Sequence, residues 1–60
     1  MTLPEMQNIQ LHSYIDVILD LKILKSQLTA DEYKAAARLA EMSKERLIAL
    51  GVQNIPDVPQ

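Results

Sequence analysis

The stretch LKSQLTADEYKAAARLAEM, residues 24–42, decides between one long helix and two helices joined by a turn. Thr29 is a favoured N-cap residue, and Glu32 follows three positions later, which is the spacing of a capping box. Asp31 and Glu32 also place negative charge in a first turn, where the helix dipole favours it. A second helix therefore begins after Thr29, and the chain folds back instead of continuing as a rod.

The sequence that follows Thr29 predicts a helix and then an extended tail. Gly51 is the only glycine, and glycine is preferred just beyond a helix because it enters the left-handed region without steric penalty. Helix two is therefore expected over about 30–50. Pro56 and Pro59 bias the residues before them toward extended backbone. Residues 51–60 are expected to form a strap over the end of a bundle, a frayed terminus, or a short motif that docks on another protein.

Upstream of the turn, predicted at 28–30, residues 3–27 favour one uninterrupted helix. Thr2 and Glu5 have capping-box spacing, and Pro4 is tolerated in a first turn. At 100° per residue the apolar side chains form two adjacent stripes that cover roughly 200°, about twice what packing on one side requires. The first stripe contains Met6, Tyr14, Val17, Leu21, Leu24 and Leu28, and the second contains Leu11, Ile15, Ile18, Leu19 and Ile23.

Helix two is apolar on one narrow side only, so its apolar surface is much narrower than that of helix one. Helix one requires two neighbours, the hairpin supplies one, and a second copy of the chain can supply the other. The sequence predicts an all-α protein, a single domain over 1–60, that forms a two-helix antiparallel hairpin and homo-oligomerises, most simply as a dimeric four-helix bundle. A higher order is left open. The predicted oligomer interface is the second stripe: Leu11, Ile15, Ile18, Leu19 and Ile23.

Composition narrows the classes of function. The chain has 60 residues, no cysteine, one histidine and a net charge of −2. Disulfides and thiolate zinc sites are excluded, and so short a chain is marginally stable as an isolated monomer. A net acidic chain is a poor binder of DNA or of membrane surfaces. The segment MTLPEMQN lacks the features of a signal peptide and no run reaches membrane-spanning length, so we expect a complete, cytoplasmic protein.

His12, Asp16 and Asp20 are successive i,i+4 neighbours on one helical face. An imidazole and two carboxylates are metal ligands, but on a single surface helix they more often form a solvated edge. No nucleophile or pocket accompanies them. We therefore expect no metal, no cofactor and no enzymatic activity.

Two lysines are candidates for binding because Lys22 and Lys25 fall within the apolar arc of helix one. Three interpretations remain open: the side chains reach water past apolar neighbours, they pair with acidic residues of a neighbouring copy, or they gather into an anion site. Tyr33, close to the turn, is a candidate binding anchor, and Arg38 lies on the polar face of helix two. The predicted anion-binding or partner-binding residues are thus Lys22, Lys25, Tyr33 and Arg38.

The turn LTADE, through Leu28, Ala30, Asp31 and Glu32, resembles the plasmid-encoded Rop proteins, small acidic two-helix chains that dimerise into a bundle and bind RNA. The likeness covers length, architecture and these turn residues, and it does not extend to the surface of helix one. The resemblance implies a dimeric bundle and RNA as a partner.

Together these patterns favour a small regulatory or accessory binding protein, of the kind typical of phages or plasmids, that presents a rigid helical surface to a protein partner. The first alternative is a Rop-like binder of RNA, a nucleotide or another small anion through Lys22 and Lys25. The second is a structural or assembly subunit that a different protein completes. The identity of the partner and the surface that carries the function are not encoded in any motif.

Overall fold

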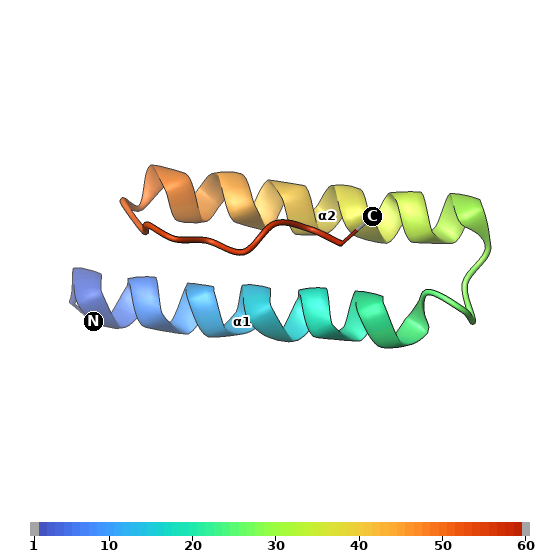
Figure 1. The fold of residues 1–60 in the computed structure, drawn as a ribbon. Helices are drawn as coiled ribbons and strands as arrows, with labels where there is room; N and C mark the ends of the chain where they lie inside the picture. The colour runs from blue at the N-terminus through green and yellow to red at the C-terminus, as the bar shows by residue number, and fades with distance from the viewer. Residues whose placement is uncertain (1, 60) are drawn as a thin grey trace.

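The computed structural model describes residues 2–59, which form two helices and an extended tail. Helix α1 (Leu3–Leu24) and helix α2 (Ala30–Ala49) lie antiparallel and pack against each other (Figure 1). The molecule is elongated, with principal dimensions of 39 × 18 × 16 Å. Residues 2–59 contain no strand, so the prediction of an all-helical hairpin is confirmed. Neither helix is long and apolar enough to cross a membrane.

The start of α2 is the predicted capping box at Thr29. The Glu32 amide donates to the Thr29 Oγ1 at 3.2 Å, and the Thr29 amide donates to the Glu32 carboxylate at 2.9 Å. The hydrogen bond that the Thr29 amide donates to the carboxylate, followed by that of the Thr29 hydroxyl, holds the pKa of Glu32 below its usual value. Helix α1 ends three residues before the predicted position 27, because the amides of Gln27 and Leu28 both turn back to the Leu24 carbonyl.

The end of α2 is a Schellman motif built around Gly51. Gly51 has a φ of 82°, its amide donates to the Ile48 carbonyl, and the Val52 amide donates to the Leu47 carbonyl at 3.1 Å. Both bonds satisfy carbonyls that the last turn of a helix leaves unpaired. The motif reverses the chain direction, so the tail leaves α2 heading back toward the turn.

The core lies between the helices and takes side chains from both apolar stripes of α1. Tyr14 and Leu21 of the first stripe and Ile18 of the second are buried, because α2 packs on the boundary between the stripes. Ala40 is fully buried, and its small side chain lets the two helices approach closely. The outer edges of both stripes stay exposed. The buried residues are Tyr14, Ile18, Leu21, Ala40, Leu47 and Val58.

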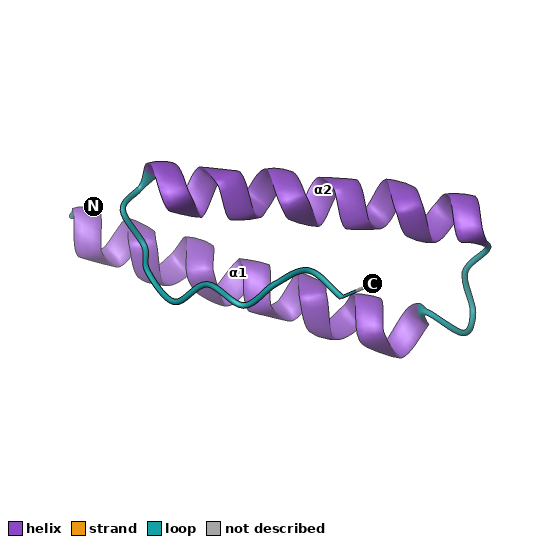
Figure 2. Ribbon diagram, turned by 45° about the horizontal axis from the view of Figure 1, so that its top comes forward, coloured by secondary structure: helices purple, strands orange, loops and turns teal. Residues whose placement is uncertain are grey.

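The tail, residues 51–59, is a strap that runs back along the groove between the helices and does not fold over the end of the hairpin (Figures 1 and 2). Val58 is buried in the core, and Val52 and Ile55 pack against it. These three residues recur every third position along the extended strap. Helix α2 is the first of the two neighbours that α1 requires, and the strap supplies part of the second.

Candidate functional site

Two tyrosine hydroxyls hold the strap in its groove. The hydroxyl of Tyr14 donates to the Pro56 carbonyl at 2.5 Å, and that of Tyr33 donates to the Pro59 carbonyl at 3.0 Å. Burial raises the pKa of Tyr14 above its ordinary value of 10.0, mainly because the phenolate would lose its hydration. Each helix thus contributes one tyrosine, and the two tyrosines bind the strap at carbonyls that are three residues apart.

Polar side chains fix both the strap and the helix end from which it leaves. The side-chain amide of Gln7 donates to the Leu50 carbonyl at 2.7 Å, which joins the start of α1 to the end of α2. The Lys44 ammonium and the Asp57 carboxylate form an ion pair at 2.6 Å. The hydrogen bond between them lowers the pKa of Asp57 and raises the pKa of Lys44. The strap is therefore an integrated part of the hairpin surface.

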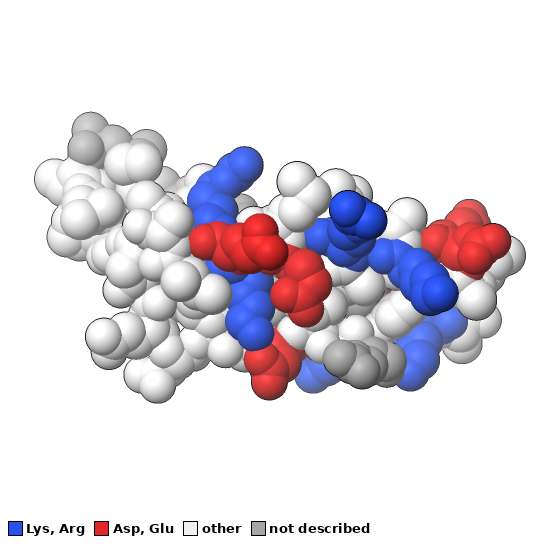
Figure 3. Space-filling model, turned by 90° about the horizontal axis from the view of Figure 1, so that it is seen from above, with Lys and Arg blue, Asp and Glu red and all other residues white. Residues whose placement is uncertain are grey.

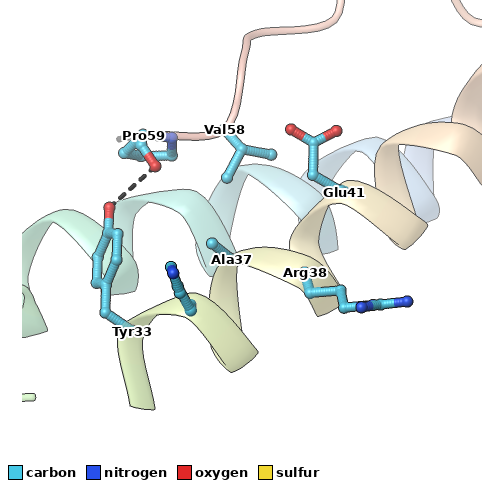
Figure 4. A pocket seen from close by; sticks show the side chains of 7 residues that line it. Tyr33, Ala37, Arg38, Glu41, Val58 and Pro59 are labelled. Carbon is cyan, nitrogen blue, oxygen red and sulfur yellow. Dashed lines mark hydrogen bonds between the residues drawn. The ribbon is translucent and has the colours of Figure 1, made fainter. Parts of the chain in front are cut away.

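A pocket of about 540 Å³ lies where the strap ends against α2 (Figure 4). Two of the predicted binding residues, Tyr33 and Arg38, line it. The Lys25 ammonium lies 5.8 Å from the centroid of the Tyr33 ring, which is a cation–π distance. Lys22 is exposed on α1 and does not line the pocket. This strap-end pocket is lined by Tyr33, Lys34, Ala37, Arg38, Glu41, Val58 and Pro59.

Charged side chains cover most of the length of α2. Figure 3 looks onto α2 and shows basic and acidic groups intermingled along it, whereas the described atoms at the end of the molecule away from the turn are uncharged in this view. Intermingled charge of both signs is typical of a solvated helix face. The charged side of α2 is therefore a poor candidate for an apolar interface.

The side of the hairpin away from the strap is apolar and uncovered. The strap lies beside Leu11 on α1. Each step of three residues moves about 60° around a helix, so Val17 lies about 120° from Leu11, beyond the core residue Tyr14. On α2 the strap lies beside Ala37, and Leu39 falls on the opposite side of the core. This open face consists of Met6, Val17 and Leu24 of α1 and Leu39 and Met42 of α2, all exposed.

A second apolar surface lies on the side of α1 that faces away from α2. Ile9, Leu19 and Ile23 fall within about 80° of one another around the helix, opposite the core residues, and all three are exposed. We call these three residues the α1 ridge. Three acidic residues lie on the same side of the helix: Glu5, Asp16 and Asp20.

The structure divides the residues predicted to form the oligomer interface. Ile18 is buried between the helices of one chain, Leu11 packs against that core, and Ile15 is half-buried. Leu19 and Ile23 are exposed and belong to the α1 ridge. The inner residues of the second stripe thus pack within one chain, and Leu19 and Ile23 are its exposed members.

The face of His12 and Asp16 holds a shallow hollow of about 400 Å³, which Asn8, Ile9 and Ser13 also line. Asp20 does not line it. Among residues 2–59, no three His, Asp or Glu side chains are grouped closely enough to hold a metal ion.

Sequence reasoning missed the anchors of the strap. The available signal was the spacing of Pro56 and Pro59 together with two tyrosines at the edges of apolar stripes, but pairing Tyr14 with Pro56 requires knowing that the tail turns back at Gly51.

No family model, no curated protein and no solved structure matches the chain.

Proposed function

We propose that this protein is a small non-enzymatic binding protein that presents a rigid helical surface to a protein partner, in a regulatory or accessory role. We also propose that it homo-oligomerises, most simply as a dimeric four-helix bundle, and that it acts in the cytoplasm. The observation that carries the proposal is the α1 ridge: Ile9, Leu19 and Ile23 expose apolar surface on a helix whose opposite face is packed.

The ridge is held in place from behind. Tyr14, Ile18 and Leu21 fix the inner side of α1 against α2, and the Tyr14 hydroxyl ties the same helix to the strap. A surface fixed in its bound conformation loses little conformational entropy on association, so more of the contact energy is kept as affinity. A flexible segment with the same three side chains would bind more weakly.

The chemistry of the ridge specifies the partner. Glu5, Asp16 and Asp20 place negative charge beside the apolar side chains. An amphipathic helix can lay its apolar side on such a surface, and basic residues along its edge would be attracted by the carboxylates. The partner we propose is therefore a protein that offers an amphipathic helix bordered by Lys or Arg.

The test is affinity capture from the source cell with the wild-type chain, with Ile23→Asp and with Ile48→Asp as the matched control. Ile23 and Ile48 are exposed to a similar extent, 68% and 59%, but Ile48 lies on α2. We expect a partner that Ile23→Asp loses and Ile48→Asp retains. Binding of the purified partner to the purified variants then measures the affinity change. A partner that binds all three chains equally would contradict the proposal.

A small-anion or RNA site is a second candidate, and the strap-end pocket favours it. Lys34, Arg38 and Glu41 line this pocket with Tyr33, over whose ring Lys25 lies. Two cations against one carboxylate leave the lining with net positive charge, which suits a phosphate group. Calorimetric titration with inorganic pyrophosphate and with single-stranded RNA tests it: binding should be lost in Arg38→Ala, weakened in Lys25→Ala and retained in Lys22→Ala, because Lys22 does not line the pocket. No heat with the wild-type chain would exclude this candidate.

The remaining alternative is a structural or assembly subunit that a different protein completes. It would use the same exposed apolar surfaces, but its partner would be bound permanently. Subunits of that kind depend on their partner for stability, so a purified chain that unfolds cooperatively on its own argues against it.

A further inference from the structure

The open face leaves one side of the hairpin uncovered while the strap covers the other (Figure 2). Val17 and Leu24 of α1 and Leu39 and Met42 of α2 are exposed there. A two-helix hairpin has a groove on each side, and in this chain the strap fills one groove and leaves the other open (Figure 2).

The exposed surface of the whole chain exceeds that expected of a compact monomer by an amount close to one side of a dimer interface. The chain exposes 4613 Å². A compact folded monomer of 6.8 kDa is expected to expose about 4,000 Å², so about 600 Å² is in excess. A stable interface buries about 800 Å² on each partner. The open side of a molecule 39 Å long and 16 to 18 Å across spans roughly that area.

The relief of the open face suits helices as occupants. Ala36 and Ser43 are half-buried and lie between the core and the exposed Leu39. They form a low floor beside large side chains, which is the arrangement that lets helices interdigitate at close distance. A pair of helices with the same relief would place its large side chains over the low floor of the other.

We infer that two copies of the chain pack open face against open face, which yields a two-fold symmetric four-helix bundle with both straps on its outside. This inference deepens the self-association in the proposed function and rests on it. It moves the interface from the predicted residues to Met6, Val17, Leu24, Leu39 and Met42.

A second copy fits this face better than a different protein does. The five apolar residues of the face carry no charge, and one cation, Arg46, lies between Leu39 and Met42 around α2. One cation is a weak charge pattern for selecting a particular partner, and the stem of Arg46 can pack on the face while its guanidinium reaches water at the rim. The α1 ridge, by contrast, has acidic residues beside it that would favour a basic partner over other proteins. Face-to-face packing leaves both ridges outside the bundle, so the dimer would present two copies of the partner-binding surface.

Sedimentation equilibrium on the full chain tests the inference. Leu39→Glu on the open face is compared with Ile48→Glu, because both residues are on α2 and are exposed to 65% and 59%. In the dimer, symmetry places two glutamates in the interface and removes two leucines, so the dissociation constant should rise by roughly a hundredfold or more. Ile48→Glu should leave the constant within about threefold of wild type.

The inference predicts a wild-type mass of twice 6.8 kDa, a monomeric Leu39→Glu variant with undiminished helical circular dichroism, and a dimeric Ile48→Glu variant. A monomeric wild type, a dimeric Leu39→Glu or an equal effect of both variants would overturn it. If Leu39→Glu loses helicity, Met42→Gln is the variant that decides. Ile23→Asp separates the two proposals, because it should abolish partner binding and leave the dimer intact.

Discussion

Replacing Val58 with alanine tests whether the strap is thermodynamically part of the fold. Val58 is 7% exposed and packs with the core residues of both helices, although it lies outside either helix. The substitution removes two buried methyl groups. At about 0.8 kcal/mol each, plus the cost of the cavity left behind, the free energy of unfolding should fall by about 1.5 to 2.5 kcal/mol.

Urea unfolding followed by far-ultraviolet circular dichroism is the appropriate assay, because the signal comes from α1 and α2 and not from the extended strap. For a chain this short, with a urea dependence near 1 kcal/mol per molar, the midpoint should fall by roughly 1.5 to 2.5 M. Protein concentration must be held constant, since self-association would contribute to the measured stability.

The control is Gln53→Ala, an exposed strap residue whose substitution should change the free energy of unfolding by less than about 0.5 kcal/mol. An unchanged helical midpoint in Val58→Ala would refute the reasoning. The strap would then open independently of the helices, and its contacts would contribute nothing to their stability.

Three further predictions concern single contacts. Gly51→Ala should cost about 1 kcal/mol in a thermal or urea melt, because Gly51 has a φ of 82° that an L side chain rarely adopts. Tyr14→Phe should cost about 1 kcal/mol through the lost hydrogen bond to Pro56. Because the pKa of Tyr14 is raised in the folded state, wild-type stability should fall as pH rises above the unfolded value of about 10, and a pH series of melts should show this loss absent in Tyr14→Phe. Acid should weaken the strap: the pKa of Asp57 is lowered by Lys44, so the contribution of the pair is present above the unfolded pKa and lost as pH falls through the folded one. The protection of strap amides, measured as the intrinsic exchange rate at each pH divided by the observed rate, should fall in this acidic range in the wild type and much less in Asp57→Asn.

The hairpin could be predicted from the sequence because its signals are local. Thr29 and Glu32 form their capping box within one turn, and Gly51 ends α2 through bonds to carbonyls three to five residues away. Patterns of this kind depend on neighbours in the chain, so reading them requires no knowledge of the fold. The end of α1 was misplaced by three residues because no glycine or proline marks it and Leu24 closes it through backbone bonds alone.

The packing direction of α1 could not be predicted from the sequence. Two adjacent apolar stripes allow α2 to contact either stripe or the boundary between them. In the structure α2 packs on the boundary, which buries Ile18 and leaves Leu19 exposed. This packing depends on Ala40, whose small side chain lies in the same core, and on Val58, which is more than 30 residues from Leu21 in the sequence. Long-range contacts of this kind have no signature in the local periodicity.

The strap changes what the broad apolar surface of α1 means. Taken alone, an arc of roughly 200° requires two further helices. In the folded chain, α2 covers the middle of the arc and residues 51–59 cover one flank, beside Leu11. The flank with Val17 and Leu24 is left, and it is continuous with Leu39 on α2, which makes it a two-helix surface. A homodimer through that surface would complete the packing of α1 on every side except the ridge. The ridge would then be the one apolar part of α1 for which folding and self-association provide no cover, and this is why a different protein is the partner to seek there.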